Sequence, residues 1–94
     1  MKHYIIVKLK DKARAREIIS PVRELFEETL SIEGFHGVKV SECCIDRPNR
    51  YHLMIVIDMD KEALEAYDVS EPHRKWKEIY GDLISEKTIF ESED

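Results

Sequence analysis

Two segments of the chain begin alike, and this repeat limits the possible folds more than any other feature of the sequence. One is HYIIVKLKDK, which starts at His3, and the other is HLMIVIDMDK, which starts at His52. Both consist largely of β-branched and other apolar residues, which favour strands, and both close on an aspartate that can start a helix. A strand followed by a helix, repeated once, predicts two β-α-β halves and therefore a ferredoxin-like α+β fold.

The first helix is predicted by apolar side chains that recur every three or four residues after Asp11. Its buried face is expected to consist of Ile18, Val22, Leu25, Phe26, Thr29 and Leu30. Pro21 interrupts this pattern, so either one helix is kinked there or Ser20 caps a new helix that begins with Pro21. We favour one kinked helix.

Turn residues, helix caps and β-rich runs place the remaining elements. In order, they are a strand around Val38 and Val40, a loop over 46–50, a strand over 51–59, a short helix that Asp60 caps and that reaches Tyr67, a helix that Ser70 caps with Pro72 in its first turn, and a strand over 87–92. The complete order is β-α-β-β-α-β. It predicts an antiparallel four-stranded sheet in a single domain over residues 1–94.

The first and third strands are apolar on both faces, which is unusual for a sheet that two helices cover on one side. In the first strand Ile5 and Val7 alternate with Tyr4 and Ile6, and in the third strand Leu53, Ile55, Ile57 and Met59 alternate with Met54 and Val56. The face away from the helices would be a large exposed apolar surface unless something packs on it. A second copy of the chain is the simplest cover, so we expect a homodimer.

Composition and charge exclude several classes of partner. The net charge is −5, with 43% hydrophobic and 37% charged residues, which is typical of a globular protein. An acidic chain lacks the basic face that a nucleic acid requires, so no nucleic-acid partner is expected. No apolar run approaches the roughly 20 residues of a membrane span. No signal peptide precedes the first strand, so we expect a cytoplasmic protein without a membrane partner.

The cysteines of the chain, Cys43 and Cys44, are adjacent. Neighbouring side chains on a strand point to opposite faces, so a disulfide between these two would be strained. We interpret both as free structural or incidental thiols.

Five segments, in order, resemble the stress-responsive A/B barrel family, also called Dabb. They are MKHYIIVKLKDK, YHLMIVIDM, EALEAY, EPHRKW and TIFES. The resemblance covers nearly the whole chain, and the order of the five segments is more specific than any one of them. It implies a ferredoxin-like chain that dimerises face to face through its sheet into a barrel, in agreement with the two-faced apolar strands.

The resemblance also suggests site residues. Plant polyketide cyclases that resemble the family use a histidine and a tyrosine, in a pocket between sheet and helices, for an aldol-type ring closure. Carried over, these are His73 as general base and Tyr67 as acid or oxyanion donor, with Glu91 orienting His73. The chain departs from the family where Ser70 replaces a histidine and Glu91 replaces an aspartate. A polyketide substrate therefore does not follow.

Two further pocket histidines carried over from the family are His3 and His52, and the expected lining includes Ile5, Val7, Met54 and Trp76. Antiparallel pairing should place His3 beside Glu91, whereas His52 begins the third strand at the opposite end of the sheet. His3 and His52 should then lie on the order of 20 Å apart, too far to share a metal. A metal site of His3, His73 and Glu91 is a weaker alternative. We expect no metal and no cofactor.

These residues allow three functions. The first is binding of a small apolar or aromatic molecule in a pocket between sheet and helices. The second is a lyase or cyclase that uses His73 and Tyr67. The third is a structural or stress-linked dimer, in which His73 is a partly exposed polar residue and Tyr67 only packs. A haem-degrading or quinone-type monooxygenase on the same barrel remains a further alternative, which no feature of the sequence requires.

Overall fold

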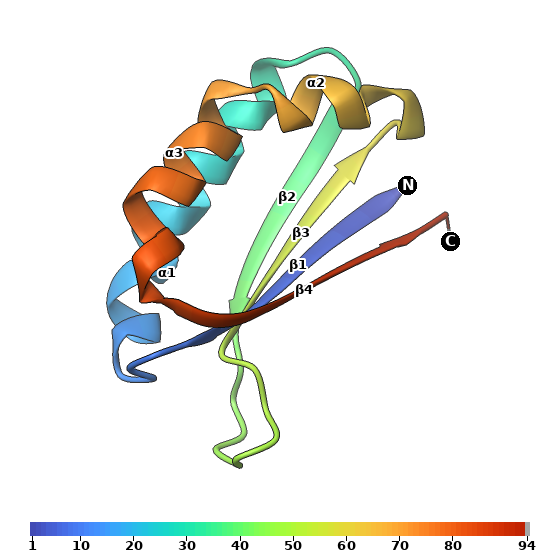
Figure 1. The fold of residues 1–94 in the computed structure, drawn as a ribbon. Helices are drawn as coiled ribbons and strands as arrows, with labels where there is room; N and C mark the ends of the chain where they lie inside the picture. The colour runs from blue at the N-terminus through green and yellow to red at the C-terminus, as the bar shows by residue number, and fades with distance from the viewer. Residues whose placement is uncertain (94) are drawn as a thin grey trace.

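The computed structural model of the protein describes residues 1–93 and contains a four-stranded sheet with helices on one of its faces (Figure 1). The elements are β1 (Lys2–Leu9), α1 (Arg14–Glu27), β2 (Phe35–Glu42), β3 (Leu53–Met59), α2 (Leu64–Asp68), α3 (Glu71–Tyr80) and β4 (Ile84–Ser92). The strand order in the sheet is β2-β3-β1-β4, and each neighbouring pair is antiparallel. This is the predicted ferredoxin-like α+β topology.

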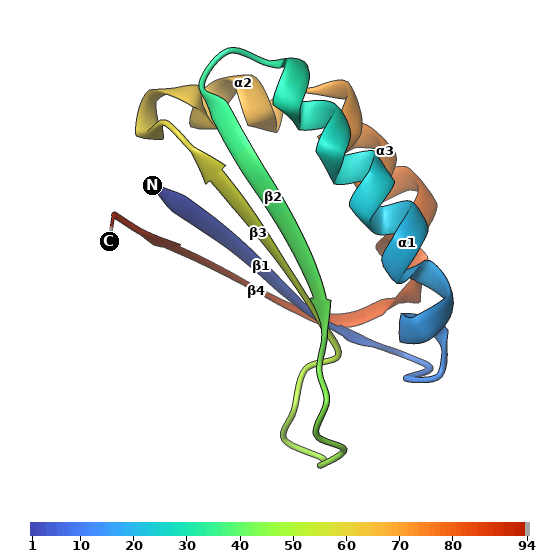
Figure 2. The same ribbon diagram turned by 180° about the vertical axis from the view of Figure 1, so that it is seen from behind.

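The core lies between the sheet and the helices α1 and α3, which Figure 2 shows side by side over the same face. Burial alternates strictly along β1 and β3, as the period of a strand requires. The ring of Phe26 on α1 meets the ring of Trp76 on α3 edge-on, with centroids 5.3 Å apart. No helix within residues 1–93 is both long enough and apolar enough to cross a membrane.

The opposite face of the sheet is uncovered, as the two-faced strands predicted. Tyr4, Ile6, Met54 and Val56 on this face are partly exposed, and Phe90 is 58% exposed. The β2–β3 loop extends beyond one end of the sheet, and both chain ends lie near the other end (Figure 1). The fold therefore has one packed face and one open apolar face.

The helix α1 is a single helix with Pro21 inside it, which confirms the prediction of one helix rather than two. The prediction that Leu30 belongs to the buried face of this helix was wrong, because Leu30 is 42% exposed. The reason is that α1 ends at Glu27 and continues as a tighter 3₁₀ turn over Glu28–Ser31, where a spacing of 3.6 residues no longer holds. Thr29 in this turn is buried, and its hydroxyl donates to the carbonyl of Phe26 at 2.6 Å.

The helix α3 begins where Ser70 predicted. The Ser70 hydroxyl accepts a hydrogen bond from the backbone N–H of His73 at 3.3 Å and donates to the carbonyl of Tyr67 at 2.7 Å. One side chain thus joins the end of α2 to the start of α3. Asp60 makes no capping bond, and its carboxylate contacts the ring of His36 instead, at 2.9 Å.

The sequence repeat predicts the order of elements correctly but is shifted by one residue relative to the sheet. Val7 of β1 is fully buried under the helices, whereas Val56, its counterpart in the repeat, lies on the uncovered face. The odd-numbered residues are the buried ones in both β1 and β3, so the repeat, whose spacing is odd, matches a buried residue of β1 with an uncovered residue of β3. His3 and His52 are therefore not structural equivalents.

Candidate functional site

A cavity of about 220 Å³ lies between the sheet and the helices α2 and α3. Six residues that the sequence analysis assigned to the site line it: His3, Ile5, Tyr67, His73, Trp76 and Glu91. They come from β1, α2, α3 and β4, so the cavity exists only in the folded chain. The structure thus brings together residues that lie far apart in the sequence.

The pairing of β1 with β4 sets the position of the first two polar groups. His3 lies opposite Glu91 in the register of these strands, as strand geometry predicted. Nδ1 of His3 is 2.8 Å from Oε2 of Glu91, and His3 is only 5% exposed. An ionised carboxylate can only accept hydrogen bonds, so the proton between them lies on Nδ1.

Tyr67 presents the least satisfied polar group of the site. Its side chain is 2% exposed, and its hydroxyl is the one buried side-chain polar atom of residues 1–93 without a hydrogen-bond partner. Burial, and secondarily the charge of Asp68, raises the pKa of Tyr67 well above its ordinary value. The hydroxyl therefore keeps its proton and can donate it in a hydrogen bond. Its ring lies 5.3 Å from that of His3 and 4.6 Å from that of His73.

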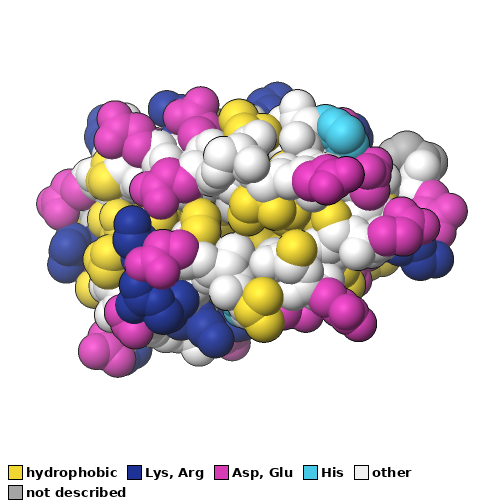
Figure 3. All heavy atoms as spheres, turned by 90° about the horizontal axis from the view of Figure 1, so that it is seen from above, with side chains coloured by type: hydrophobic (Ala, Val, Ile, Leu, Met, Phe, Trp, Pro, Cys, Tyr) yellow, Lys and Arg dark blue, Asp and Glu magenta, His cyan; other side chains and the backbone are white. Residues whose placement is uncertain are grey.

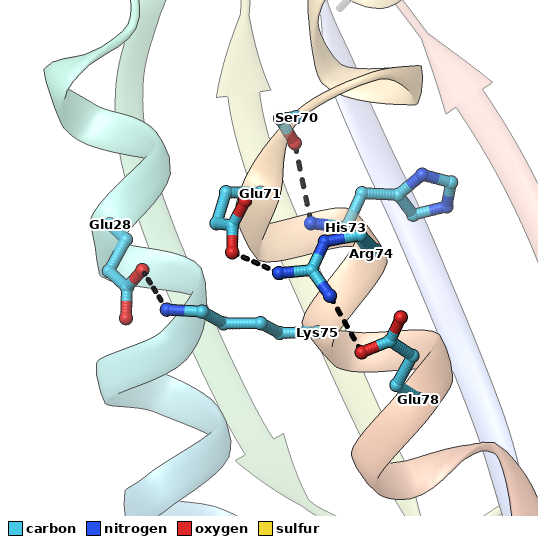
Figure 4. Close-up of polar contacts among 7 residues, drawn as sticks. All are labelled: Glu28, Ser70, Glu71, His73, Arg74, Lys75 and Glu78. Atoms are coloured by element: carbon cyan, nitrogen blue, oxygen red, sulfur yellow. Dashed lines mark hydrogen bonds and ion pairs between the residues drawn. The ribbon is translucent and has the colours of Figure 1, made fainter.

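His73 is held by the backbone rather than by a carboxylate. Its Nδ1 lies 3.0 Å from the carbonyl oxygen of Asp68, and because a carbonyl only accepts, Nδ1 must carry the proton. Figure 4 shows the ring on the side of α3 that is turned away from Glu28 and Lys75. We expected Glu91 to orient His73, but Glu91 bonds His3 instead. The β1–β4 register places Glu91 beside His3, while the end of α2 offers His73 a nearer acceptor.

Three residues expected at the site lie elsewhere. The backbone N–H of His52 donates to the carbonyl of Val7, and its Nδ1 accepts from Leu9, which places His52 at the end of β1 opposite to His3. Val7 is fully buried in the core, and Met54 is on the uncovered face. Antiparallel pairing of β1 with β3 accounts for the place of His52, and alternation along β3 accounts for that of Met54.

Four lining residues were not anticipated: Leu64, Asp68, Lys87 and Ile89. For two of them a signal was present, since Lys87 and Ile89 alternate with Glu91 along β4 and so share its face. The carbonyl of Asp68 holds His73, and no side-chain pattern shows where a backbone oxygen lies. Within residues 1–93, no group of three or more His, Cys, Asp or Glu side chains could hold a metal ion.

A larger hollow, of about 640 Å³, lies between the end of α1 and the start of α3, with Glu28, Val69 and Glu71 among its walls. From the viewpoint of Figure 3, acidic side chains surround hydrophobic ones at the middle of the molecule. Two of the acidic groups of this hollow are paired: Glu71 with Arg74, and Glu28 with Lys75 at 3.4 Å (Figure 4). The smaller cavity is lined by Tyr67, whose buried hydroxyl has no partner in the described chain, so it is the better candidate site.

No family model and no curated protein matches this sequence. Solved structures match its fold. A Dabb family protein with a ferredoxin-like fold from Mesorhizobium loti has a TM-score of 0.71 at 12% identity, over 95% of this chain and 90% of that chain. A dimeric protein of unknown function and ferredoxin-like fold from Bacteroides fragilis has a TM-score of 0.75 at 12% identity, over 95% and 90%.

A dimeric ferredoxin-like protein of unknown function from Thermobifida fusca has a TM-score of 0.76 at 15% identity, over 95% of this chain and 85% of that chain. Identities this low establish the fold and leave function open. The protein has the ferredoxin-like α+β fold, and its structural neighbours include a member of the Dabb family that its sequence resembles.

Proposed function

We propose that the protein is a homodimer that binds a small apolar or aromatic molecule in the cavity between its sheet and helices. The observation that supports this most strongly is the hydroxyl of Tyr67, a residue that lines the cavity: it is buried, protonated and without a partner in the described chain. A buried polar group without a hydrogen bond costs free energy. A ligand with an acceptor atom would remove that cost.

The size and walls of the cavity favour a single ring. Its volume of about 220 Å³ is below the roughly 300–1,000 Å³ of sites that hold drug-sized molecules. The walls between the polar groups are apolar or aromatic: Ile5, Leu64, Trp76 and Ile89. A small ring with an oxygen acceptor fits both observations.

Calorimetric titration with 4-hydroxyacetophenone, a single ring that carries a carbonyl and a hydroxyl, tests the binding function. The wild-type protein should bind it, and Tyr67→Phe should weaken binding about five-fold, the effect of losing one hydrogen bond of about 1 kcal/mol. Tyr80→Phe, at the far end of α3, is the matched control and should bind as the wild type does. Absence of binding by the wild type would favour the structural alternative, in which the cavity is closed.

The uncovered face of the sheet supports the dimer. Tyr4 and Phe90 lie with their rings 6.0 Å apart on this face, beside Ile6 and Met54. Monomeric proteins rarely expose contiguous apolar patches of this kind. Two of the similar solved structures are described as dimeric. Contact between two such faces would bury the patch on both chains at once.

A charge placed on the uncovered face tests the dimer. Val56→Lys puts an ammonium group at the centre of the proposed interface and should give the mass of a single chain in light scattering. Val69→Lys is the matched control, because Val69 is 86% exposed between α2 and α3, away from this face. A wild-type protein with the mass of one chain at micromolar concentration would contradict the proposal.

A cyclase or lyase activity is a second candidate, favoured by the state of His73. With the proton on Nδ1, the neutral ring has a lone pair on Nε2 that can act as a base. Tyr67 beside it could donate to a developing oxyanion. Loss of turnover of a linear keto compound in His73→Ala, with ligand binding and the dimer intact, would establish catalysis. Unchanged turnover in that variant would exclude His73 as the base.

A further inference from the structure

We infer that the β2–β3 loop of one copy of the chain, residues 43–52, docks into the hollow between α1 and α3 of a second copy, so that molecules associate end to end at low ionic strength. This contact is separate from the proposed dimer, which uses the uncovered face of the sheet. Three features support it: the distribution of charge along the chain, the walls of the hollow, and the side chains at the tip of the loop.

The hollow lies at an acidic end of the molecule. The segment 24–33, which includes the end of α1, contains four acidic residues and no basic one, and the segment 60–71, around α2, contains five acidic residues and one basic. Together they hold nine of the 20 acidic residues but one of the 15 lysines and arginines. The rest of the chain, with 11 acidic and 14 basic residues, therefore carries a net positive charge.

The walls of the hollow combine apolar surface with a carboxylate that lacks a counter-charge. The apolar surface comes from Ile32, Ala66 and Pro72. Within residues 1–93, Glu27 at the wall makes no ion pair, unlike Glu28 and Glu71, and no lysine or arginine lines the hollow. Its volume of about 640 Å³ lies within the roughly 300–1,000 Å³ of sites that hold drug-sized molecules, so several side chains of a partner can enter it.

The opposite end of the molecule is basic. Residues 8–16, from the end of β1 to the start of α1, contain five lysines and arginines and one aspartate. The β2–β3 loop extends from this end, and Lys12 holds it by an ion pair with Asp46 (Figure 1). The acidic hollow of one copy and the basic end of another therefore attract each other.

The tip of the loop carries side chains complementary to the hollow. Arg47 is exposed and makes no ion pair within the described chain, and Ile45 is 47% exposed. A guanidinium against the carboxylate of Glu27, with an isoleucine against the apolar walls, matches both properties of the hollow. Loop and hollow lie at opposite ends of one molecule (Figure 1), so the loop that enters a hollow belongs to another copy. Such head-to-tail contacts can continue from copy to copy.

Sedimentation velocity at two ionic strengths tests the inference, because salt screens a contact between exposed charges. In about 0.01 M sodium chloride, where charges act over roughly 30 Å, the wild type should form species that grow with protein concentration. In about 1 M, where the range falls to roughly 3 Å, it should keep one mass at every concentration. A thiol reductant in both solutions excludes disulfides through the exposed Cys44.

Charge exchange between loop and hollow locates the contact. Glu27→Lys and Arg47→Glu, both at exposed positions, should each abolish the growth at low salt. The two substitutions together restore opposite charges and should restore the growth. Glu24→Lys is the matched control, since Glu24 lies one turn earlier on α1 and outside the hollow, and it should retain most of the growth.

A wild type with the same mass at both salt concentrations overturns the inference. Growth that persists in Glu27→Lys or Arg47→Glu, or that the double variant does not restore, also overturns it, because the contact would then lie elsewhere. If Glu24→Lys abolishes growth as fully as Glu27→Lys does, the net charge of the chain causes the association and the hollow does not.

Discussion

At the scale of single residues, the structure contains one buried polar group whose hydrogen bond is missing. The hydroxyl of Tyr67 has no partner within residues 1–93, although Tyr67 is held between the rings of His3 and His73. An unpartnered buried hydroxyl destabilises a fold by about 1–3 kcal/mol relative to an apolar group of the same shape. Such groups are few in native proteins, and a catalytic role or a bound water or ion is among their explanations.

Tyr67→Phe should therefore raise the stability of the ligand-free protein, by about 1 kcal/mol, since it removes the hydroxyl and keeps the ring. Urea unfolding monitored by circular dichroism measures this, with Tyr80→Phe as a control that should change stability little. A loss of stability of similar size in Tyr67→Phe would mean that the hydroxyl is satisfied in solution, and the argument for a ligand acceptor would lose its basis.

His52 should make stability depend on pH. Its Nδ1 accepts a hydrogen bond from the N–H of Leu9 at 2.9 Å, which a protonated ring could not do. Burial, and then the charges of Lys12 and Lys8, lowers the pKa of His52 below its ordinary value of 6.5, with Asp46 opposing them. The unfolded chain therefore takes up this proton first as the pH falls.

The stability that neutral His52 contributes is fully present above pH 6.5 and is lost as the pH falls through the lowered value. Urea unfolding at pH 7 and pH 5 should show a larger fall in the wild type than in His52→Asn, whose amide oxygen accepts at either pH. His36→Asn, at an exposed histidine, controls for a general effect of removing an imidazole. Equal falls in the wild type and His52→Asn would contradict this role.

At the scale of elements, Pro21 weakens α1 without breaking it. Pro21 is exposed inside the helix and has no N–H to donate to the preceding turn. Pro21→Ala should restore that bond and stabilise the protein by about 1 kcal/mol, less than the full propensity difference because alanine also frees the unfolded chain. A lower melting temperature in Pro21→Ala would contradict this account of Pro21.

The elements also show what sequence patterns can and cannot predict. The period of two in β1 and β3 gave the buried face of the sheet, and Ser70 gave the start of α3. The proximity of His3 and Glu91 followed from strand order alone. The partner of His73 could not be predicted, because it is a backbone carbonyl whose position depends on where α2 ends. Leu30 was misplaced because a 3₁₀ turn changes the helical period.

At the scale of the whole molecule, the two faces of one sheet have separate tasks in this account. The helix-covered face forms the core and the cavity, with His3 and Glu91 reaching it from paired strands. The uncovered face, centred on Tyr4 and Val56, is proposed to meet a second chain. Because the interface and the cavity lie on different faces, Val56→Lys should reduce the mass in solution to that of one chain and leave the cavity intact.

The central claim is that the cavity between sheet and helices receives a small ring. The most direct measurement is a crystal structure of the protein soaked with 4-hydroxyacetophenone. We predict the ring in the cavity, with its carbonyl oxygen within hydrogen-bond distance of the Tyr67 hydroxyl. An empty cavity, with the ketone bound only on the uncovered face of the sheet or between α1 and α3, would contradict the account.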